Sequence, residues 1–337
     1  MKRWTVTAIL AVLLPVVAVV GVFVGGQALS PGQVLDAIGG HGAPEAVAVV
    51  RELRIPRALL GVVVGAGLGT AGALMQAMTR NPLAEPGILG VNAGAAAAVV
   101  TGLVVSTAAG GPSSGVAMTF LSFGYAFLGA AAASLLVMVL GGAFKEGTDP
   151  VRLTLAGAAC AIVLGSYTNA VTLNRPDLFE AFVHWGVGSL QGRGLDVVWP
   201  TATIVLPAVV VAGLAGRWLN ALALGRDMGT ALGADPRRLW VIGGCLVVAL
   251  AGGATAAAGP ISFVGLAAPL AVRSLVGPDY RWVLPLSALA AAIIVLVADL
   301  VGRLVMPPTE VETGVVSALI GAPVFIALVR RRRLARL

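Results

Sequence analysis

Residues 54–92 read RIPRALLGVVVGAGLGTAGALMQAMTRNPLAEPGILGVN. This stretch opens with the arginine pair Arg54 and Arg57, continues as an apolar segment striped with glycine, and closes in the polar turn at 80–86 before the next apolar run. A run of this length, with charge at one end and a tight turn at the other, predicts a membrane-spanning helix that returns at once as a second one.

The composition extends this reading to the whole chain. Of the 337 residues, 58% are hydrophobic and 11% are charged, and the mean hydropathy is +0.97. A soluble domain must face water and cannot be so apolar. Because the apolar runs are long and continuous, they favour helices over the short alternating strands of a membrane barrel. We therefore expect an all-α polytopic membrane protein with a single transmembrane domain over residues 1–337.

The apolar runs predict ten transmembrane helices of about 20 residues each. They lie near residues 5–28, 56–78, 87–107, 115–142, 151–172, 195–216, 238–258, 260–277, 282–304 and 313–329. The seventh and eighth are separated only by Gly259 and Pro260. The first is too long for the apolar region of a signal peptide, so we expect it to be retained.

The basic residues predict the orientation. With the N-terminus inside, 16 of the 22 lysines and arginines fall at cytoplasmic ends. Those left outside are Arg51, Arg54, Arg57, Arg175, Arg193 and Arg303. Short basic loops stay inside, so both termini are expected in the cytoplasm. Because the charges are dispersed among loops and form no basic face, the net charge of +7 does not indicate nucleic-acid binding.

The sequence lacks the constellations that membrane enzymes use. The two histidines, His41 and His184, are far apart, and the chain contains no Ser/His/Asp or HExxH arrangement. It has no GxxxxGK[ST] phosphate loop, and its only lysines are Lys2 and Lys145. We expect no catalytic residue, metal or cofactor, and no ATP hydrolysis by this chain alone.

Two features of the expected spans allow two interpretations each. Asp299 is four residues before Arg303, on the same helix face. The pair is either an ion pair near the outer end of the ninth span, which we favour, or a proton- or sodium-coupling site.

Gly61, Gly65 and Gly69 form a stripe that permits close helix packing. Packing within the chain is favoured over contact with a second subunit.

Several motifs together resemble the FecCD family, the permease subunits of ABC importers for ferric siderophores, haem and cobalamin. They cover nearly the whole chain in the family's order: RIPR at 54–57, Gln76, RNPLAEP at 80–86, Leu89–Gly90, residues 155–157, WGVGSL at 185–190, ALGRDMGTALG at 223–233, GPISFVGLAAP at 259–269, Arg273, Ala298–Asp299, Arg303 and GAPVF at 321–325. The sequence departs from the family pattern at Leu270, at Glu310–Val311–Glu312 and at Arg226.

The resemblance implies a set of partners in a bacterial cytoplasmic membrane. Two permease subunits, identical or paralogous, enclose one pathway through the lipid bilayer. Two cytoplasmic ATP-binding subunits power it, and an extracytoplasmic binding protein delivers the substrate. The absence of a phosphate loop is then expected. A ferric siderophore is the favoured substrate on the breadth of the family, with haem and cobalamin as alternatives.

The resemblance also assigns three groups of site residues. Arg54, Arg57 and Arg303 are expected to dock the binding protein through bidentate contacts; the alternative is that they anchor the helices at the membrane surface. Asn81 and Leu83 are expected at an inner gate, unless they form a plain turn. Coupling to the ATPase is expected in the cytoplasmic segment 217–238, through Leu224, Gly225, Arg226, Asp227, Met228, Gly229, Leu232 and Gly233.

The competing functional class is an ion-coupled secondary transporter or channel without an ATPase. The segment 217–238 discriminates, because a permease must insert an apolar element into its ATPase and a carrier has no such need. Its alternative interpretation is an amphipathic loop on the lipid surface.

Overall fold

The computed structural model describes residues 3–110, 116–143, 150–223, 235–306 and 309–330, and over these ranges the chain is helical with no strand. The helices are α1 (Arg3–Phe23), α2 (Pro31–Gly39), α3 (Pro44–Ala48), η1 (Val49–Arg54), α4 (Ile55–Thr79), η2 (Pro86–Leu89), α5 (Val91–Ala108), α6 (Val116–Leu140), α7 (Pro150–Asn174), α8 (Pro176–Gly186), α9 (Leu195–Leu214), α10 (Gly216–Ala223), α12 (Pro236–Val247), η3 (Val248–Gly252), α13 (Gly253–Ala258), α14 (Val264–Val276), α15 (Tyr280–Val305) and α16 (Thr313–Arg330).

Local sequence signals set several helix boundaries. Asp235 and Asp279 cap the N-termini of α12 and α15 by accepting hydrogen bonds from backbone amides of the first turn. Gly259 has a φ of +71°, a conformation that glycine tolerates, and it ends α13. The expected break between the seventh and eighth spans is therefore present. The short helices α2, α3 and α8 were not anticipated.

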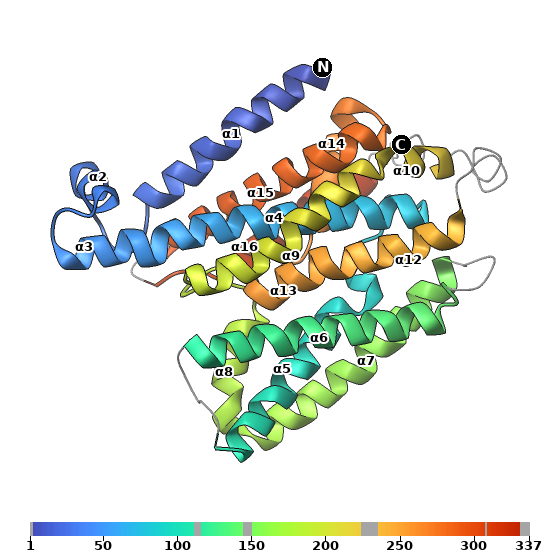
Figure 1. Ribbon diagram of the computed structural model, residues 1–337, viewed down its shortest axis with the longest axis horizontal. Coiled ribbons are helices and arrows are strands. Elements are labelled where there is room, and N and C mark those ends of the chain that lie inside the picture. The colour runs from blue at the N-terminus through green and yellow to red at the C-terminus, as the bar shows by residue number, and fades with distance from the viewer. Residues whose placement is uncertain (1–2, 111–115, 144–149, 224–234, 307–308, 331–337) are drawn as a thin grey trace.

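Helix α4 forms the centre of the molecule (Figure 1). Almost every residue from Leu60 to Thr79 is buried, and the helix contacts α9, α14 and, most extensively, α15. A second group, α5, α6 and α7, packs together on one side of this core (Figure 1).

The glycine stripe of α4 packs within the chain. A Cβ atom on Gly65 would lie 2.4 Å from the Cα atom of Ala292, and one on Gly69 would lie 2.2 Å from the carbonyl oxygen of Ser287. Both neighbours belong to α15. Because no side chain fits these gaps, glycine allows the two backbones to touch. The prediction of intramolecular packing is confirmed.

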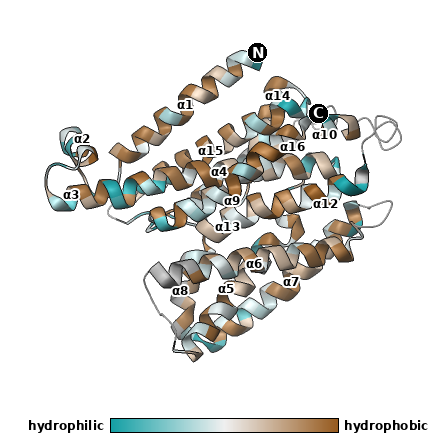
Figure 2. Ribbon diagram, in the orientation of Figure 1, coloured by the Kyte–Doolittle hydropathy of each residue, from teal (hydrophilic) through white to brown (hydrophobic). Residues whose placement is uncertain are grey.

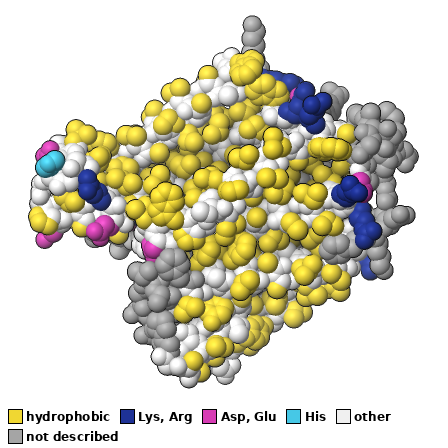
Figure 3. Space-filling view, viewed as in Figure 1, with side chains coloured by type: hydrophobic (Ala, Val, Ile, Leu, Met, Phe, Trp, Pro, Cys, Tyr) yellow, Lys and Arg dark blue, Asp and Glu magenta, His cyan; other side chains and the backbone are white. Residues whose placement is uncertain are grey.

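The outer surface matches a bilayer. Hydrophobic side chains cover most of the face in Figure 3, charged ones gather toward its two ends, and the helices are largely apolar along their length (Figure 2). Among the described residues, eight helical segments are long and apolar enough to cross a membrane. Two of the ten expected spans, α14 and the Thr313–Pro323 part of α16, are shorter apolar helices. Ten crossings therefore remain a prediction.

The two ends of the bundle hold different charged groups. At one end, Arg3 Nη1 lies 3.3 Å from Asp279 Oδ2, and Asn220 Nδ2 donates to Asp279 Oδ1 at 2.7 Å. These bonds join the start of α1 to α10 and α15. Arg54 and Arg303 lie at the other end of α1, about 30 Å away for a helix of this length. Arg3, which was expected inside, and Arg54 and Arg303, which were expected outside, thus lie at opposite ends.

Candidate functional site

The first candidate site is a buried charge cluster, which we call the outer cluster: Arg54, Arg57, Asp299, Arg303, Glu310 and Thr313. Asp299 is at its centre, with 2% of the residue exposed. Its carboxylate accepts from Arg57 Nη2 at 2.8 Å and Nε at 3.0 Å, from Thr313 Oγ1 at 3.0 Å and from Arg303 Nη2. Arg57 Nη1 also donates to Glu310 Oε2 at 2.6 Å. One carboxylate thus joins α4, α15 and α16.

The other two arginines bind the end of α1. Arg303 Nη1 donates to the carbonyl oxygens of Gly21 at 2.7 Å and Val24 at 2.9 Å. Arg54 Nη1 donates to the carbonyl oxygens of Val22 and Phe23, each at 3.1 Å. The last carbonyls of a helix have no partner within it, and they carry the negative end of its dipole. The guanidinium groups of Arg54 and Arg303 donate hydrogen bonds to these carbonyls and place positive charge at the negative end of the dipole.

The predicted pairing of Asp299 with Arg303 is confirmed, and the structure extends it. Arg57 is 242 residues from Asp299 in sequence, and Glu310 follows α15, so helical spacing gave no signal for either contact. With two arginines on one carboxylate, the site supports the structural interpretation of Asp299 over ion coupling, because an ion would have to displace a guanidinium group.

Burial changes the docking prediction for two of the three arginines. Arg54 is 5% exposed and Arg303 is 3% exposed, and both bind groups of their own chain. In this conformation neither offers a guanidinium group to another protein. The Arg57 side chain is the most accessible of the three, at 11%, and it faces Glu310 at the edge of the cluster. The physical reason is that the carbonyls at the end of α1 compete for the same donors.

The second candidate is the turn between α4 and α5. Arg80 ends α4 with a φ of +51°, and Asn81 Oδ1 accepts a hydrogen bond from the backbone amide of Leu83 at 2.9 Å. This is the side-chain-closed turn typical of asparagine. Asn81 and Leu83 are both exposed. The geometry accounts for the turn, and the inner-gate role remains a prediction.

Glu85 lies in the same turn and is partly buried. Burial raises the pKa of this carboxyl group, because desolvation disfavours its charged form. The following Pro86 contacts α14, where a Cβ atom on Gly265 would lie 3.2 Å from Pro86 Cδ. The turn is therefore held against the core and carries a titratable group.

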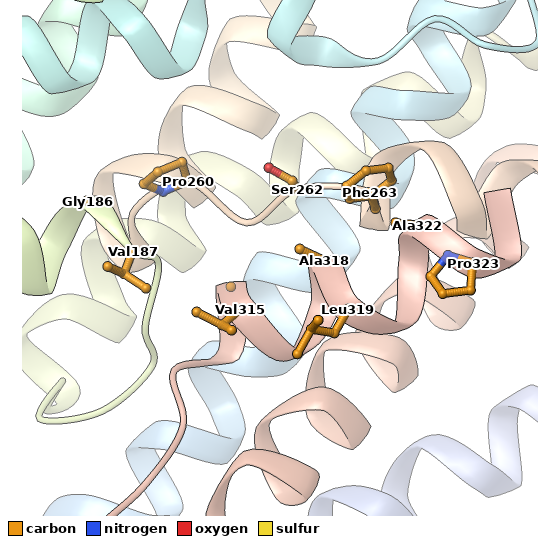
Figure 4. A pocket seen from close by; sticks show the side chains of 11 residues that line it. Gly186, Val187, Pro260, Ser262, Phe263, Val315, Ala318, Leu319, Ala322 and Pro323 are labelled. Atoms are coloured by element: carbon orange, nitrogen blue, oxygen red, sulfur yellow. The ribbon is translucent and has the colours of Figure 1, made fainter. Parts of the chain in front are cut away.

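The third candidate is an open apolar cavity of about 640 Å³ (Figure 4). One wall is α16, with Val315, Ala318 and Leu319. The opposite wall comes from the segment between α13 and α14, with Pro260 and Phe263, and Gly186 and Val187 at the end of α8 complete it. Among the described residues the lining is mostly apolar, which suits weak contact with a bulky ligand.

The backbone of the cavity wall is unusual at Phe263. Its φ is +66°, which is rare for a bulky residue. A Cβ atom on Gly321 of α16 would lie 2.5 Å from Phe263 Cβ, so the two segments pack without a gap. Backbone in a sparsely populated region tends to occur at functional sites. Sequence reasoning named the motif around Phe263 but did not identify it as a cavity wall.

The residues predicted to couple to an ATPase, Leu224 to Gly233, lie outside the described residues. The described flanks are α10, which ends at Ala223, and α12, which begins at Pro236.

Comparison with known proteins decides the family. The model of the FecCD transport family matches residues 13–331. This chain belongs to the FecCD transport family. The FecCD resemblance predicted from the motifs is therefore confirmed.

Relatives and solved structures agree with the FecCD assignment. The ferric enterobactin transport system permease protein FepD of Escherichia coli (strain K12) is 43% identical, over 96% of this chain and 94% of its own. A probable siderophore transport system permease protein, YfiZ of Bacillus subtilis (strain 168), is 39% identical over 98% and 97%. A solved structure described as a metal-chelate type ABC transporter in an inward-facing conformation superposes with a TM-score of 0.82, at 25% identity, over 98% of this chain and 99% of that one.

Two departures from the FecCD pattern have a clear place in the fold. Leu270 is fully packed in α14, with 2% exposed. Glu312 directly precedes α16, and its carbonyl oxygen accepts from the amides of Val315 and Val316. The third, Arg226, lies outside the described residues.

Proposed function

We propose that this chain is the transmembrane permease subunit of an ABC importer that moves a ferric siderophore into the bacterial cytoplasm across the inner membrane. The observation that carries the proposal is similarity over nearly the whole chain to permeases named for ferric enterobactin and siderophore transport. Two separate ATP-binding subunits supply the energy, and both termini of the permease lie in the cytoplasm.

The apolar cavity beside α16 is proposed as one wall of the pathway, and a second permease subunit supplies the other. None of the described residues that line it has a charged side chain. In a ferric chelate the chelator already coordinates the iron, so the pathway needs to make only weak contacts with its surface. Helix α7 supports a second subunit, because it is the least apolar of the eight spanning segments and leaves polar side chains exposed. These are Thr154, Ser166, Tyr167, Asn169 and Asn174. Thr154, Tyr167 and Asn174 form hydrogen bonds within the chain. Among the described residues Ser166 and Asn169 show no side-chain hydrogen bond, and lipid would offer them no partner.

The end that holds the outer cluster is the proposed docking surface for an extracytoplasmic binding protein. Arg57 makes the contact, and Arg54 and Arg303 hold the surface from beneath. An acidic residue of the binding protein would share the Arg57 guanidinium group with Glu310.

The docking proposal is tested with Arg57→Gln, using Arg51→Gln as the matched control. Arg51 is exposed at the same end and donates only to the carbonyl oxygen of Ile38 among the described residues. Affinity for the binding protein should fall by roughly tenfold for Arg57→Gln, since truncating one partner of a charge pair costs at least about 2 kcal/mol when it is buried and less at a rim. Unchanged affinity in a variant that folds normally would leave Arg57 with a purely structural role.

The function itself is tested by copurification. The chain, coexpressed with the ATP-binding subunit of its importer, should copurify with that subunit from detergent. Deleting residues 224–234 should abolish the association and leave membrane insertion intact. A chain that transports an iron chelate without any ATP-binding subunit would contradict the proposal.

A further inference from the structure

A groove unrelated to the pathway opens between the ends of α9, α10 and α12. Two adjoining cavities of about 410 and 400 Å³ share Asp235, Arg238 and Ile242 in their linings. The larger is lined mainly by apolar side chains: Val211, Leu214, Ala215, Trp218, Leu222, Leu239 and Ile242. Leu214 is 75% exposed and Trp218 is 56% exposed. We call this surface the α9–α12 groove.

The groove lies at the cytoplasmic end of the bundle in the proposed orientation. Helix α10, which carries Trp218, is bonded through Asn220 to Asp279, and Asp279 also binds Arg3 at the start of α1. A tryptophan with its apolar body at the level of helix ends is typical of the membrane interface. The groove therefore runs from the hydrocarbon region to the membrane surface.

Arginines line its surface end. Arg237 and Arg238 start α12, and both are exposed. Arg238 Nε is 3.2 Å from Asp235 Oδ2, with side-chain exposures of 83% and 47%, and such a pair in water is weak. The other oxygen of Asp235 accepts from the backbone amides of Arg237 and Arg238. Within the described ranges, the Arg237 side chain has no hydrogen bond or ion pair.

We propose that the α9–α12 groove binds an anionic phospholipid of the inner leaflet. An acyl chain would lie along Val211, Leu214 and Ile242, and the phosphate group would accept from Arg237 and Arg238. The argument is charge complementarity: the occupant must be apolar at one end and anionic at the other. Basic side chains next to a spanning helix attract anionic lipid, and a guanidinium group suits phosphate oxygens. The site needs neither the pathway nor a transported substrate, but its leaflet rests on the proposed orientation.

The test measures quenching of Trp218 fluorescence by brominated lipid. The full chain is reconstituted in phosphatidylcholine vesicles that contain equal fractions of dibrominated phosphatidylglycerol or dibrominated phosphatidylcholine. The Trp218 contribution is the difference between the native chain and Trp218→Phe. Brominated phosphatidylglycerol should quench it at a lower mole fraction, with a preference of about fivefold for each arginine at low salt, and high salt should reduce that preference.

In the double variant Arg237→Gln, Arg238→Gln, the two brominated lipids should quench Trp218 fluorescence equally. Arg217→Gln is the matched control, since Arg217 is exposed on α10 but lines neither cavity; it should keep the preference. Equal quenching of the native chain by both lipids would overturn the proposal. A Trp218 signal that neither lipid quenches would also overturn it, because the groove would then be covered by protein. Loss of the lipid preference when the ATP-binding subunits are added would overturn it as well. No outcome depends on transport.

Discussion

At the scale of single residues, the outer cluster is organised by one carboxylate. Asp299 neutralises Arg57 and Arg303, each within hydrogen-bond distance and largely buried. A buried charge is tolerated only when it is paired and its hydrogen bonds are satisfied. The arrangement therefore depends on Asp299 more than on any one arginine.

Removing this charge should unfold part of the outer end. Asp299→Asn leaves Arg303 without its carboxylate partner and leaves Arg57 paired with Glu310 alone, and breaking a buried pair typically costs about 3–5 kcal/mol. We expect a large loss of folded permease, measured by size-exclusion chromatography of detergent-solubilised membranes after heating. Asp36→Asn is the control, since Asp36 is exposed on α2. Normal thermal stability of Asp299→Asn would show that the cluster does not hold the fold.

Glu85 should make the turn between α4 and α5 sensitive to pH. Burial raises the pKa of Glu85 above its unfolded value of about 4.3. A raised pKa means that the folded state favours the neutral acid, so this contribution to stability is complete below the unfolded pKa and is lost as pH rises through the folded pKa. Glu85→Gln, which stays neutral, should melt at a higher temperature than the native chain at pH 8 and at the same temperature at pH 4. An equal difference at both values would rule out titration as the cause.

At the scale of helices, the contact between α4 and α15 determines the core. The glycines of α4 face backbone atoms of α15 at distances that exclude any side chain. Sequence spacing predicted the stripe and its role, because a repeat of four residues places glycines on one helix face. It could not identify α15 as the partner, since that contact joins segments more than 200 residues apart.

Adding one methyl group to the glycine stripe of α4 should test its close packing against α15. Gly69→Ala places a Cβ atom 2.2 Å from the carbonyl oxygen of Ser287, whereas Gly213→Ala in α9 meets nothing within 4 Å of its own chain. Both changes raise helix propensity equally. Gly69→Ala should destabilise by about 1–3 kcal/mol through overpacking, and Gly213→Ala should be neutral or mildly stabilising. Equal melting temperatures for the two variants would contradict the close packing.

The long apolar helices could be predicted from sequence to within a few residues, and the short elements could not. Long apolar runs announce α4 and α15 by length alone. The small helices α2, α3 and α8 lie in the connections between long helices, where turn chemistry and tertiary contacts decide the structure. The pair Asp299–Arg303 was predictable because it is local. Arg57, Glu310 and the wall at Phe263 were not predictable as contacts, because each depends on how distant helices pack.

At the scale of the whole molecule, the proposed function makes this chain one subunit of a larger transport complex. On the face shown in Figure 3 its surface is apolar along the bundle and its charges gather toward the ends, and an open cavity lies beside α16. If this cavity is one wall of the pathway, as proposed, a second subunit must supply the other wall. The coupling residues Leu224 to Gly233 follow α10 and precede α12 in the sequence, and an ATP-binding partner is proposed to act there.

The central claim is that ATP hydrolysis by partner subunits drives an iron chelate through a pathway formed by this chain. The most direct measurement is uptake of radiolabelled ferric siderophore into proteoliposomes that contain the permease, its ATP-binding subunits and its binding protein, with a protonophore present. We predict uptake that requires ATP and the binding protein and continues after the proton gradient has collapsed. Uptake that follows the ion gradient and proceeds without the ATP-binding subunits would contradict the account.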